Sequence, residues 1–200
     1  MNSTSKCEND SLRNNSSRLI LGVDLDNVLA LTDSLIRKLI KKIFKISLQQ
    51  NNIIEFDYYR CGINKEQNRI VLDCFHSVEC SNVKPIKDAI EALQSLLNKF
   101  TIYIVTSRPP QTRNLTLQWI KRHKIPFDKL IFIKTKRDSK TSFNIFIEDH
   151  RETAYSMARK GVISFLLDYP WNQPNPVDPP NLYRVKSWRE IKEHLLKLSI

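Results

Sequence analysis

The stretch 21-LGVDLDNVLALTD-33 ends an apolar run in two acidic residues, Asp24 and Asp26, one residue apart. Carboxylates at this spacing repel each other and resist burial, although the residues before them are typical of a buried strand. Either the strand ends in a solvated turn, or the two carboxylates share a cation and take part in chemistry. The rest of the sequence favours the second interpretation.

The composition is typical of a globular domain, since 41% of the 200 residues are hydrophobic and 26% are charged. No apolar run approaches the ~20 residues that a membrane-spanning helix needs. Residues 1–17 are polar and lack the apolar core of a signal peptide, so we predict a disordered tail there and no membrane partner. The four cysteines form no CxxC pair, which favours a reduced, cytoplasmic setting.

The net charge of +11 favours anionic partners. Nucleic acid would fit this charge, but the basic residues are scattered along the chain and no RNA-binding signature or zinc finger accompanies them. A phosphorylated small molecule fits the charge equally well. Because only the charge favours nucleic acid, we do not expect nucleic acid as the partner.

Five short apolar runs alternate with helical patterns along most of the chain. The runs occupy residues 18–24, 100–106, 130–134, 144–148 and 162–168. Their non-alternating Ile, Val, Leu and Phe residues are typical of parallel strands covered on both faces. Helices are predicted over 33–46, after Pro85, from Thr112 to about His123, from about Glu152 to Lys160, and from a capping box at Ser187 and Glu190. This alternation predicts a three-layer, Rossmann-like α/β fold with a central parallel sheet.

One segment interrupts the alternation. Residues 47–84 contain no long buried strand, yet they are rich enough in aromatic side chains to favour a packed unit over a meandering loop. We predict a small, mainly helical insertion at 33–84, over the sheet edge, and a core formed by 18–32 and 85–200. The proline-rich segment 169–180 is expected to be extended.

Polar side chains follow the apolar runs, at the strand ends where open parallel sheets bind their ligands. They are Asp24 and Asp26; Thr106, Ser107 and Arg108; Lys134, Lys136 and Lys140; and Glu148 and Asp149. Carboxylates for a hard cation, hydroxyls and an ammonium are thus predicted to meet at one edge. This set suits magnesium and a phosphate group.

These motifs resemble those of the haloacid dehalogenase-like (HAD) phosphatase superfamily. The stretch "DLDNV" is similar to its first motif, "VTSRP" to the second, the lysine cluster to the third and "IED" to the fourth. The stretches "LGVDLDNVLA", "LLDYPWN" and "RVKSWREI" resemble the 5'(3')-deoxyribonucleotidase branch, the cytosolic type C 5'-nucleotidase family. The superfamily resemblance covers roughly residues 18–168 and implies a HAD core with a helical cap.

The resemblance also implies a role for each motif residue. Asp24 would be the nucleophile that attacks phosphorus and forms an aspartyl-phosphate. Asp26 would protonate the leaving oxygen and then activate water. Since a free aspartic acid has a pKa of ~3.9, the surroundings would have to keep Asp26 protonated for the first step. Thr106 and the backbone amide of Ser107 would hold phosphate oxygens.

Magnesium would be held by Asp24, the backbone carbonyl of Asp26, Asp149 and waters. Glu148 is expected to orient a water rather than to bind the ion. The third-motif lysine could be Lys134, Lys136 or Lys140. We favour Lys136 because it falls in the turn after the strand.

The predicted function is that of a magnesium-dependent 5'-nucleotidase acting on (deoxy)nucleoside monophosphates. A sugar phosphate or a nucleic-acid terminal phosphate is the alternative substrate, and a non-catalytic binding module is a third interpretation. The role of Arg108 and the formation of a homodimer are left open. Tyr58, Tyr59 and Arg60 are candidates for contacts with a base or sugar. Packing or solvated roles are expected for His76, His123, His150, Trp119, Trp171 and Trp188.

Overall fold

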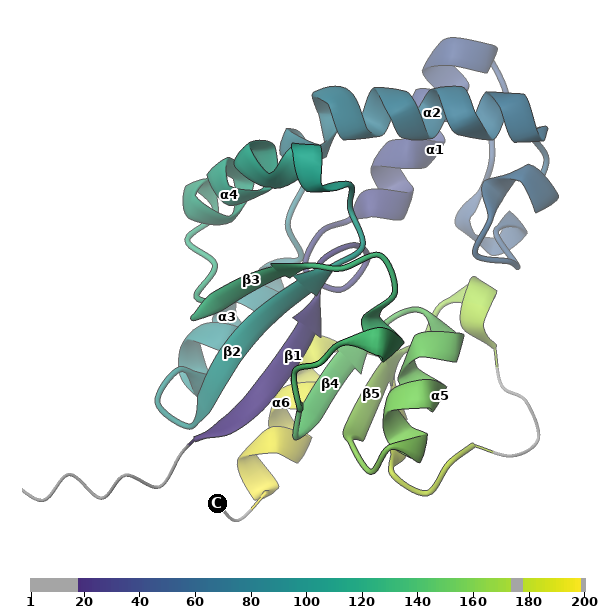
Figure 1. The fold of residues 1–200 in the computed structure, drawn as a ribbon. Helices are drawn as coiled ribbons and strands as arrows, with labels where there is room; N and C mark the ends of the chain where they lie inside the picture. Colours follow the sequence, from purple (N-terminus) through teal and green to yellow (C-terminus); the bar gives the residue numbers. More distant parts are fainter. Residues whose placement is uncertain (1–17, 174–177, 199–200) are drawn as a thin grey trace, which may run out of the picture.

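A computed structural model of the chain describes residues 18–173 and 178–198, so the tail predicted at 1–17 lies outside the described residues. Six parallel strands form one sheet in the order β3-β2-β1-β4-β5-β6 (Figure 1). The strands are β1 Leu19–Asp24, β2 Phe100–Thr106, β3 Lys129–Phe132, β4 Ile145–Glu148, β5 Ile163–Leu167 and β6 Leu182–Val185. The predicted α/β fold with a parallel sheet is confirmed.

The sixth strand, β6, is absent from the five predicted strands. It has four residues, of which Leu182 and Val185 are buried and Tyr183 is exposed. So short a segment at the edge of the sheet shows neither a continuous apolar run nor a clear alternation. Its pairing with β5, which brings Leu166 opposite Arg184, is a long-range contact that the sequence pattern does not encode.

Six α-helices complete the described part of the chain. They are α1 Thr32–Phe44, α2 Lys65–Ser77, α3 Lys87–Leu96, α4 Arg113–Arg122, α5 Arg151–Arg159 and α6 Trp188–Lys197. The side chain of Ser187 caps α6 by accepting the backbone N–H of Glu190, but the Glu190 carboxylate accepts from Lys186 rather than Ser187. The Thr112 hydroxyl does not cap α4, because it donates to the carbonyl of Pro109. The predicted caps are therefore only partly correct.

Helices cover both faces of the sheet, because the side chains of β1 and β2 are mostly apolar and need to be buried on both faces. Residues of α3, α4 and α6, including Trp119, pack with Leu21 and Val23 in the larger buried cluster. On the opposite face Phe146 packs with Met157 of α5. Figure 1 shows α5 on one side of the sheet and α3 and α6 on the other. No helix in the described ranges is both long and apolar enough to cross a membrane.

The segment between β1 and α3 folds beyond the carboxyl ends of the strands (Figure 1). It contains α1, α2 and three short 3-10 helices, and it has its own buried cluster, which includes Ile40, Val71 and Phe75. We call residues 33–84 the insertion. Whether the insertion is a separate cap domain stays a prediction.

The two ends of the insertion run side by side. The backbone N–H of Leu31 donates to the carbonyl of Lys84 at 2.8 Å, and that of Ile86 donates to Leu29 at 2.8 Å. Ala30 and Pro85 form an antiparallel bridge between these bonds. Pro85 thus closes the insertion instead of opening α3, which begins two residues later.

Candidate active site

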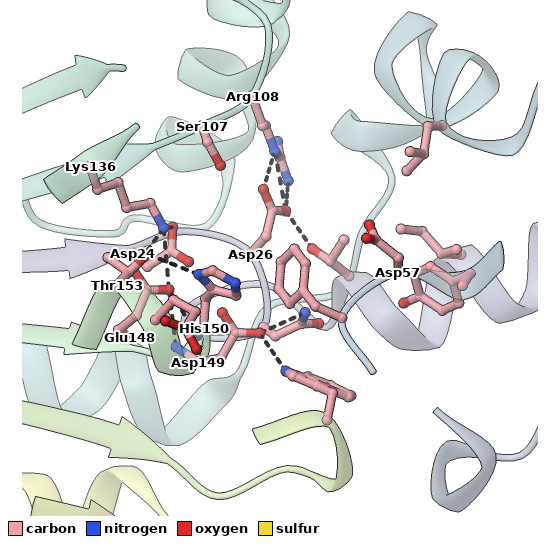
Figure 2. A pocket seen from close by; sticks show the side chains of 18 of the residues that line it. Asp24, Asp26, Asp57, Ser107, Arg108, Lys136, Glu148, Asp149, His150 and Thr153 are labelled. Carbon is pink, nitrogen blue, oxygen red and sulfur yellow. Dashed lines mark hydrogen bonds and ion pairs between the residues drawn. The ribbon is translucent and has the colours of Figure 1, made fainter. Parts of the chain in front are cut away.

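A cavity of about 530 Å³ lies between the carboxyl edge of the sheet and the insertion. Core residues form its floor, among them Asp24, Arg108 and Lys136, and the insertion contributes side chains that include Tyr58 and Phe75. Figure 2 shows Asp24, Lys136, Glu148 and Asp149 close together, with Asp26 and Arg108 beside them and Asp57 of the insertion farther away. The cavity therefore occupies the place that the polar strand ends predict.

Asp24 is the last residue of β1, the strand between β2 and β4, and its side chain is buried. The turn that follows is fixed by apolar burial, since Leu25 and Val28 enter the main core. Asn27 adopts a positive φ of 58°, which asparagine tolerates better than most residues. The chain can therefore reverse directly after Asp24 and hold its carboxylate at the edge of the sheet.

Three buried carboxylates meet beside the end of β1. One oxygen each of Asp24, Glu148 and Asp149 lies within 4.8 Å of the others, because β1 and β4 are neighbours in the sheet. Lys136 reaches this acid cluster with its Nζ 2.6 Å from Asp24 Oδ1 and 2.9 Å from Glu148 Oε2 (Figure 2). The backbone N–H groups of Asp149 and His150 donate to Glu148 Oε1.

The electrostatics of the acid cluster show a shortage of positive charge. Burial, and then the charge of Glu148, raise the pKa of Asp24 well above its usual range, although Lys136 opposes this rise. Burial and Glu148 likewise raise the pKa of Asp149 well above its usual range. Burial also raises the pKa of Glu148, but Lys136 and hydrogen bonds lower it more. One ammonium faces three buried carboxylates, so the donor set fits a divalent cation that prefers oxygen ligands.

Asp26 is paired with Arg108 rather than with the acid cluster. Arg108 donates from Nη2 to Asp26 Oδ1 at 2.7 Å and from Nε to Oδ2 at 3.0 Å, and Thr32 donates its hydroxyl to Oδ1. Burial raises the pKa of Asp26, but the charge and hydrogen bonds of Arg108, the Thr32 hydrogen bond and the charge of Lys136 together lower it more, so the net shift is downward. The expectation that the surroundings keep Asp26 protonated is therefore wrong for this state of the site.

The two second-motif residues are placed differently. Thr106 is fully buried at the end of β2, and its hydroxyl accepts the backbone N–H of Arg108 at 3.1 Å. Ser107 is exposed and lines the cavity, which Thr106 does not. The structure thus brings Ser107, but not the Thr106 side chain, to the surface of the cavity.

The three candidate lysines are also separated. Lys136 begins the short 3-10 helix Lys136–Asp138 and is buried against Asp24. Lys134 lines the cavity but is exposed, and Lys140 is exposed and lines a different, smaller cavity. The position of Lys136 supports the preference for it as the third-motif lysine.

The insertion contributes fewer of the candidate residues than expected. Tyr58 lines the cavity and donates its hydroxyl to Asp33 at 3.0 Å. Tyr59 and Arg60 do not line it, and Arg60 pairs with Glu55 at the surface.

Side chains that the sequence leaves without a site role also reach the cavity. His76, His150 and Trp171 line it, and burial lowers the pKa of both histidines. His123 lies away from the cavity, against the ring of Trp119. The expectation that Trp171 only packs is incomplete, because its indole N–H donates to Asp149 Oδ2 at 3.2 Å.

Comparison with known proteins decides the family. The model of a family described as "5' nucleotidase, deoxy (Pyrimidine), cytosolic type C protein" matches residues 18–199. The chain belongs to this family. Another nucleotidase, from Clostridium acetobutylicum, is 24% identical to this family member over 156 residues, which are 76% of this chain and 71% of the relative. The predicted resemblance is confirmed, and this nucleotidase-family protein is a phosphoric monoester hydrolase.

Solved structures of HAD hydrolases have the same fold as this family member. The HAD hydrolase YfnB of Bacillus subtilis, bound to magnesium, has a TM-score of 0.58 at 16% identity, with 90% of this chain and 99% of that chain covered. A HAD-family hydrolase of Deinococcus radiodurans with bound phosphate and sodium has a TM-score of 0.62 at 14% identity, covering 89% and 95%. These likenesses confirm the α/β fold of the core.

Proposed function

We propose that this enzyme is a magnesium-dependent 5'-nucleotidase that hydrolyses (deoxy)nucleoside monophosphates through an aspartyl-phosphate on Asp24. The contact between Asp24 and Lys136, at 2.6 Å on the floor of the cavity, carries the proposal. It joins a buried carboxylate, suited to be a nucleophile, to the ammonium that a phosphate group needs. The cytoplasmic location and a homodimer stay predictions.

The metal site would use residues that already lie together. Asp24 and Asp149 would bind Mg²⁺ through carboxylate oxygens, and Asp26 would bind it through its backbone carbonyl. Bound Mg²⁺ would neutralise part of the negative charge of Asp24 and of the phosphate, which otherwise repel each other. Glu148, held by Lys136 and by two backbone N–H groups, is better placed to fix the lysine than to orient a water, which revises its expected role.

In the first step a carboxylate oxygen of Asp24 attacks phosphorus, and the bond between phosphorus and the nucleoside oxygen breaks. Asp26 gives a proton to that leaving oxygen. Its carboxylate is paired with Arg108 before substrate binds, and the arrival of a phosphate dianion beside it raises its pKa, because like charges disfavour ionisation. In the second step Asp26 takes a proton from water, which attacks phosphorus and frees Asp24.

The remaining motif residues would hold the transferring group. Lys136 would offset the negative charge that the phosphate oxygens carry in both steps. The backbone N–H of Ser107, and the Thr106 hydroxyl if it turns from Arg108, would donate to the same oxygens.

The shape of the cavity supports a mononucleotide. Its volume of about 530 Å³ is within the usual range for small-ligand sites, and the insertion covers it. Phe56, Tyr58 and Phe75 line the insertion side and are of the type that stacks on a base. Stacking contributes ~1–3 kcal/mol per base, which would favour a nucleotide over a sugar phosphate of the same charge.

A phosphate-release panel tests this function. It compares nucleoside 5'- and 3'-monophosphates, sugar phosphates and phosphorylated oligonucleotides, each with Mg²⁺ and with excess chelator. We expect a mononucleotide to give the highest kcat/KM and chelation to stop turnover reversibly. Asp24→Asn, which cannot attack phosphorus, is the control for a contaminating phosphatase and should lose at least about 10³-fold in kcat.

Two results of the panel would contradict the proposal. Higher kcat/KM for sugar phosphates or oligonucleotide ends than for every mononucleotide would exclude the nucleotidase function and leave only the phosphatase function. Full turnover in excess chelator would exclude the metal-dependent mechanism.

A further inference from the structure

The segment after β5 contacts Asp149 of the acid cluster. It contains Tyr169 and the short 3-10 helix Pro170–Asn172. The Asn172 side chain donates to the backbone carbonyl of Asp149 and to that of Leu167, each at 2.7 Å. Trp171 donates its indole N–H to the carboxylate of Asp149. Two neighbouring residues thus hold both the main chain and the side chain of Asp149.

The hydrogen bonds to Asp149 distinguish its two carboxylate oxygens. Oδ2 accepts from Trp171 Nε1 at 3.2 Å and from Asn27 Nδ2 at 3.1 Å. Oδ1 accepts no hydrogen bond from the residues that the structure describes. Rotating the carboxylate would break two bonds inside a buried site, so this side chain is held with Oδ1 as the available oxygen.

Trp171 is itself held from two directions. Its ring stacks on Tyr169, with centroids 4.4 Å apart and planes 6° from parallel, and the Tyr169 hydroxyl donates to the carbonyl of Asn27 at 2.8 Å. The ring also packs against the buried cluster of the insertion and lines the cavity. The indole N–H therefore has a fixed direction, toward Asp149.

We propose that Trp171 is a positioning residue for magnesium: its indole N–H, with Asn27, holds Asp149 Oδ2 so that Oδ1 is presented to the ion. The inference rests on the proposed function in taking Mg²⁺ as the ion of the acid cluster. Partners that orient a ligating carboxylate commonly change metal affinity 10- to 100-fold when they are removed. Because the same ring packs against the insertion, the seating of the insertion and the orientation of Asp149 depend on one side chain.

The test is the affinity of the substrate-free protein for Mg²⁺, measured by isothermal titration calorimetry. Trp171→Phe keeps an aromatic ring beside Tyr169 but removes the N–H donor and part of the ring volume, so the control must lose the same volume. Trp119→Phe is the matched control, since its indole N–H donates to the backbone carbonyl of Val83 and its ring does not line the cavity. We expect about a tenfold or greater loss of Mg²⁺ affinity in Trp171→Phe and none in Trp119→Phe.

Steady-state kinetics give a second measurement, which would stay unchanged if the role of Trp171 were merely structural. In Trp171→Phe the Mg²⁺ concentration for half-maximal activity should rise by the same factor as the dissociation constant, and kcat should recover at saturating Mg²⁺. If Trp171→Phe fails to fold, Tyr169→Phe removes the hydroxyl donated to Asn27 while keeping the stacked ring, and a smaller loss of affinity in the same direction is expected.

Each contrary result has a distinct meaning. Unchanged Mg²⁺ affinity in Trp171→Phe, or in Tyr169→Phe if that variant is used, overturns the inference, as does an equal loss in Trp119→Phe. Wild-type protein that binds no Mg²⁺ overturns both the inference and the metal-dependent function. Mg²⁺ binding that weakens in Trp171→Phe while the wild type hydrolyses no phosphomonoester supports the inference and contradicts only the function.

Discussion

Lys136 is the cation on which the buried carboxylates depend. Its ammonium is buried between Asp24 and Glu148, and although burial lowers its pKa, these two carboxylates raise it more, so it stays charged. Removing one partner from a buried ion pair leaves an uncompensated charge, which is strongly unfavourable. The lysine therefore stabilises the buried acid cluster, and under the proposed function it would also act on the bound phosphate.

Replacing each candidate lysine with methionine tests this assignment. Lys136→Met should lower kcat about 10²- to 10³-fold, as expected when a group that stabilises developing charge is removed. Lys140→Met should have nearly wild-type kcat, because Lys140 is exposed and outside the cavity, and Lys134→Met should fall between the two. The assignment fails if Lys136→Met is the least impaired of the three variants in steady-state assays.

A site residue can be predicted from the sequence when the residues next to it in the chain form a recognisable pattern. Asp24 ends a recognisable strand, and Asp149 and Lys136 come shortly after one. The sequence does not reveal the contacts of Arg108 and Trp171, because their partners are distant: Arg108 is 82 positions from Asp26, and Trp171 is 22 positions from Asp149. For Arg108 the one available signal in the sequence is its position beside the second motif, and this position does not reveal a carboxylate partner.

At the scale of elements, the predicted strands β1 to β5 agree with the structure to within about two residues, because each is a dense apolar run between polar ends. The interior of the insertion could not be predicted in the same way. Its three 3-10 helices are each three residues long, too short for a periodic pattern, and their positions depend on packing with α1 and α2.

Tyr58 makes the stability of the insertion decrease with pH in the alkaline range. Its buried hydroxyl donates to Asp33, and burial, followed by the charge of Asp33, raises its pKa well above the usual value. A tyrosine in the unfolded chain ionises near pH ~10. The folded state keeps its proton longer, so the contribution of Tyr58 to stability is fully present below pH ~10 and is lost as the pH rises above it.

The comparison of Tyr58→Phe with wild type isolates this effect. At pH 8 the variant should be less stable by about 1.5–3 kcal/mol, the usual contribution of a hydrogen bond to a charged group. Above pH ~10 the difference should shrink by up to ~1.4 kcal/mol per pH unit. Urea unfolding at pH 8, 10.5 and 11 measures it, with Tyr59→Phe, a tyrosine outside the cavity, as control. A difference that stays constant with pH would contradict the account.

For the whole molecule, the acid cluster links folding to divalent cations. Burying three carboxylates beside a single ammonium is unfavourable, as the raised pKa values of Asp24 and Asp149 show. An ion that binds only the folded state removes part of this penalty for the entire chain. Stability should therefore increase with Mg²⁺ even without substrate.

Thermal unfolding measures this linkage. At a Mg²⁺ concentration of 100 times the dissociation constant, the gain is ~2.7 kcal/mol, which raises Tm by about 5–10 °C in a chain of this size. Asp149→Asn should abolish most of the rise, whereas Asp138→Asn, on the exposed side of the Lys136–Asp138 helix, should retain it. An equal rise in the two variants would show that Mg²⁺ acts elsewhere.

The hydrogen-bonded ends of the insertion have a consequence for protein engineering. Two backbone hydrogen bonds join the chain that enters the insertion to the chain that leaves it, and they are made by Leu29, Leu31, Lys84 and Ile86. The entropic free-energy cost of closing an insertion of this kind grows only slowly with its length, by about 0.6 kcal/mol for each doubling. A graft of a longer or shorter insertion between these anchors would keep the sheet, and a graft that also packs against the Trp171 ring would keep the orientation of Asp149. Such a graft would exchange the cover of the cavity without rebuilding the strand ends beneath it.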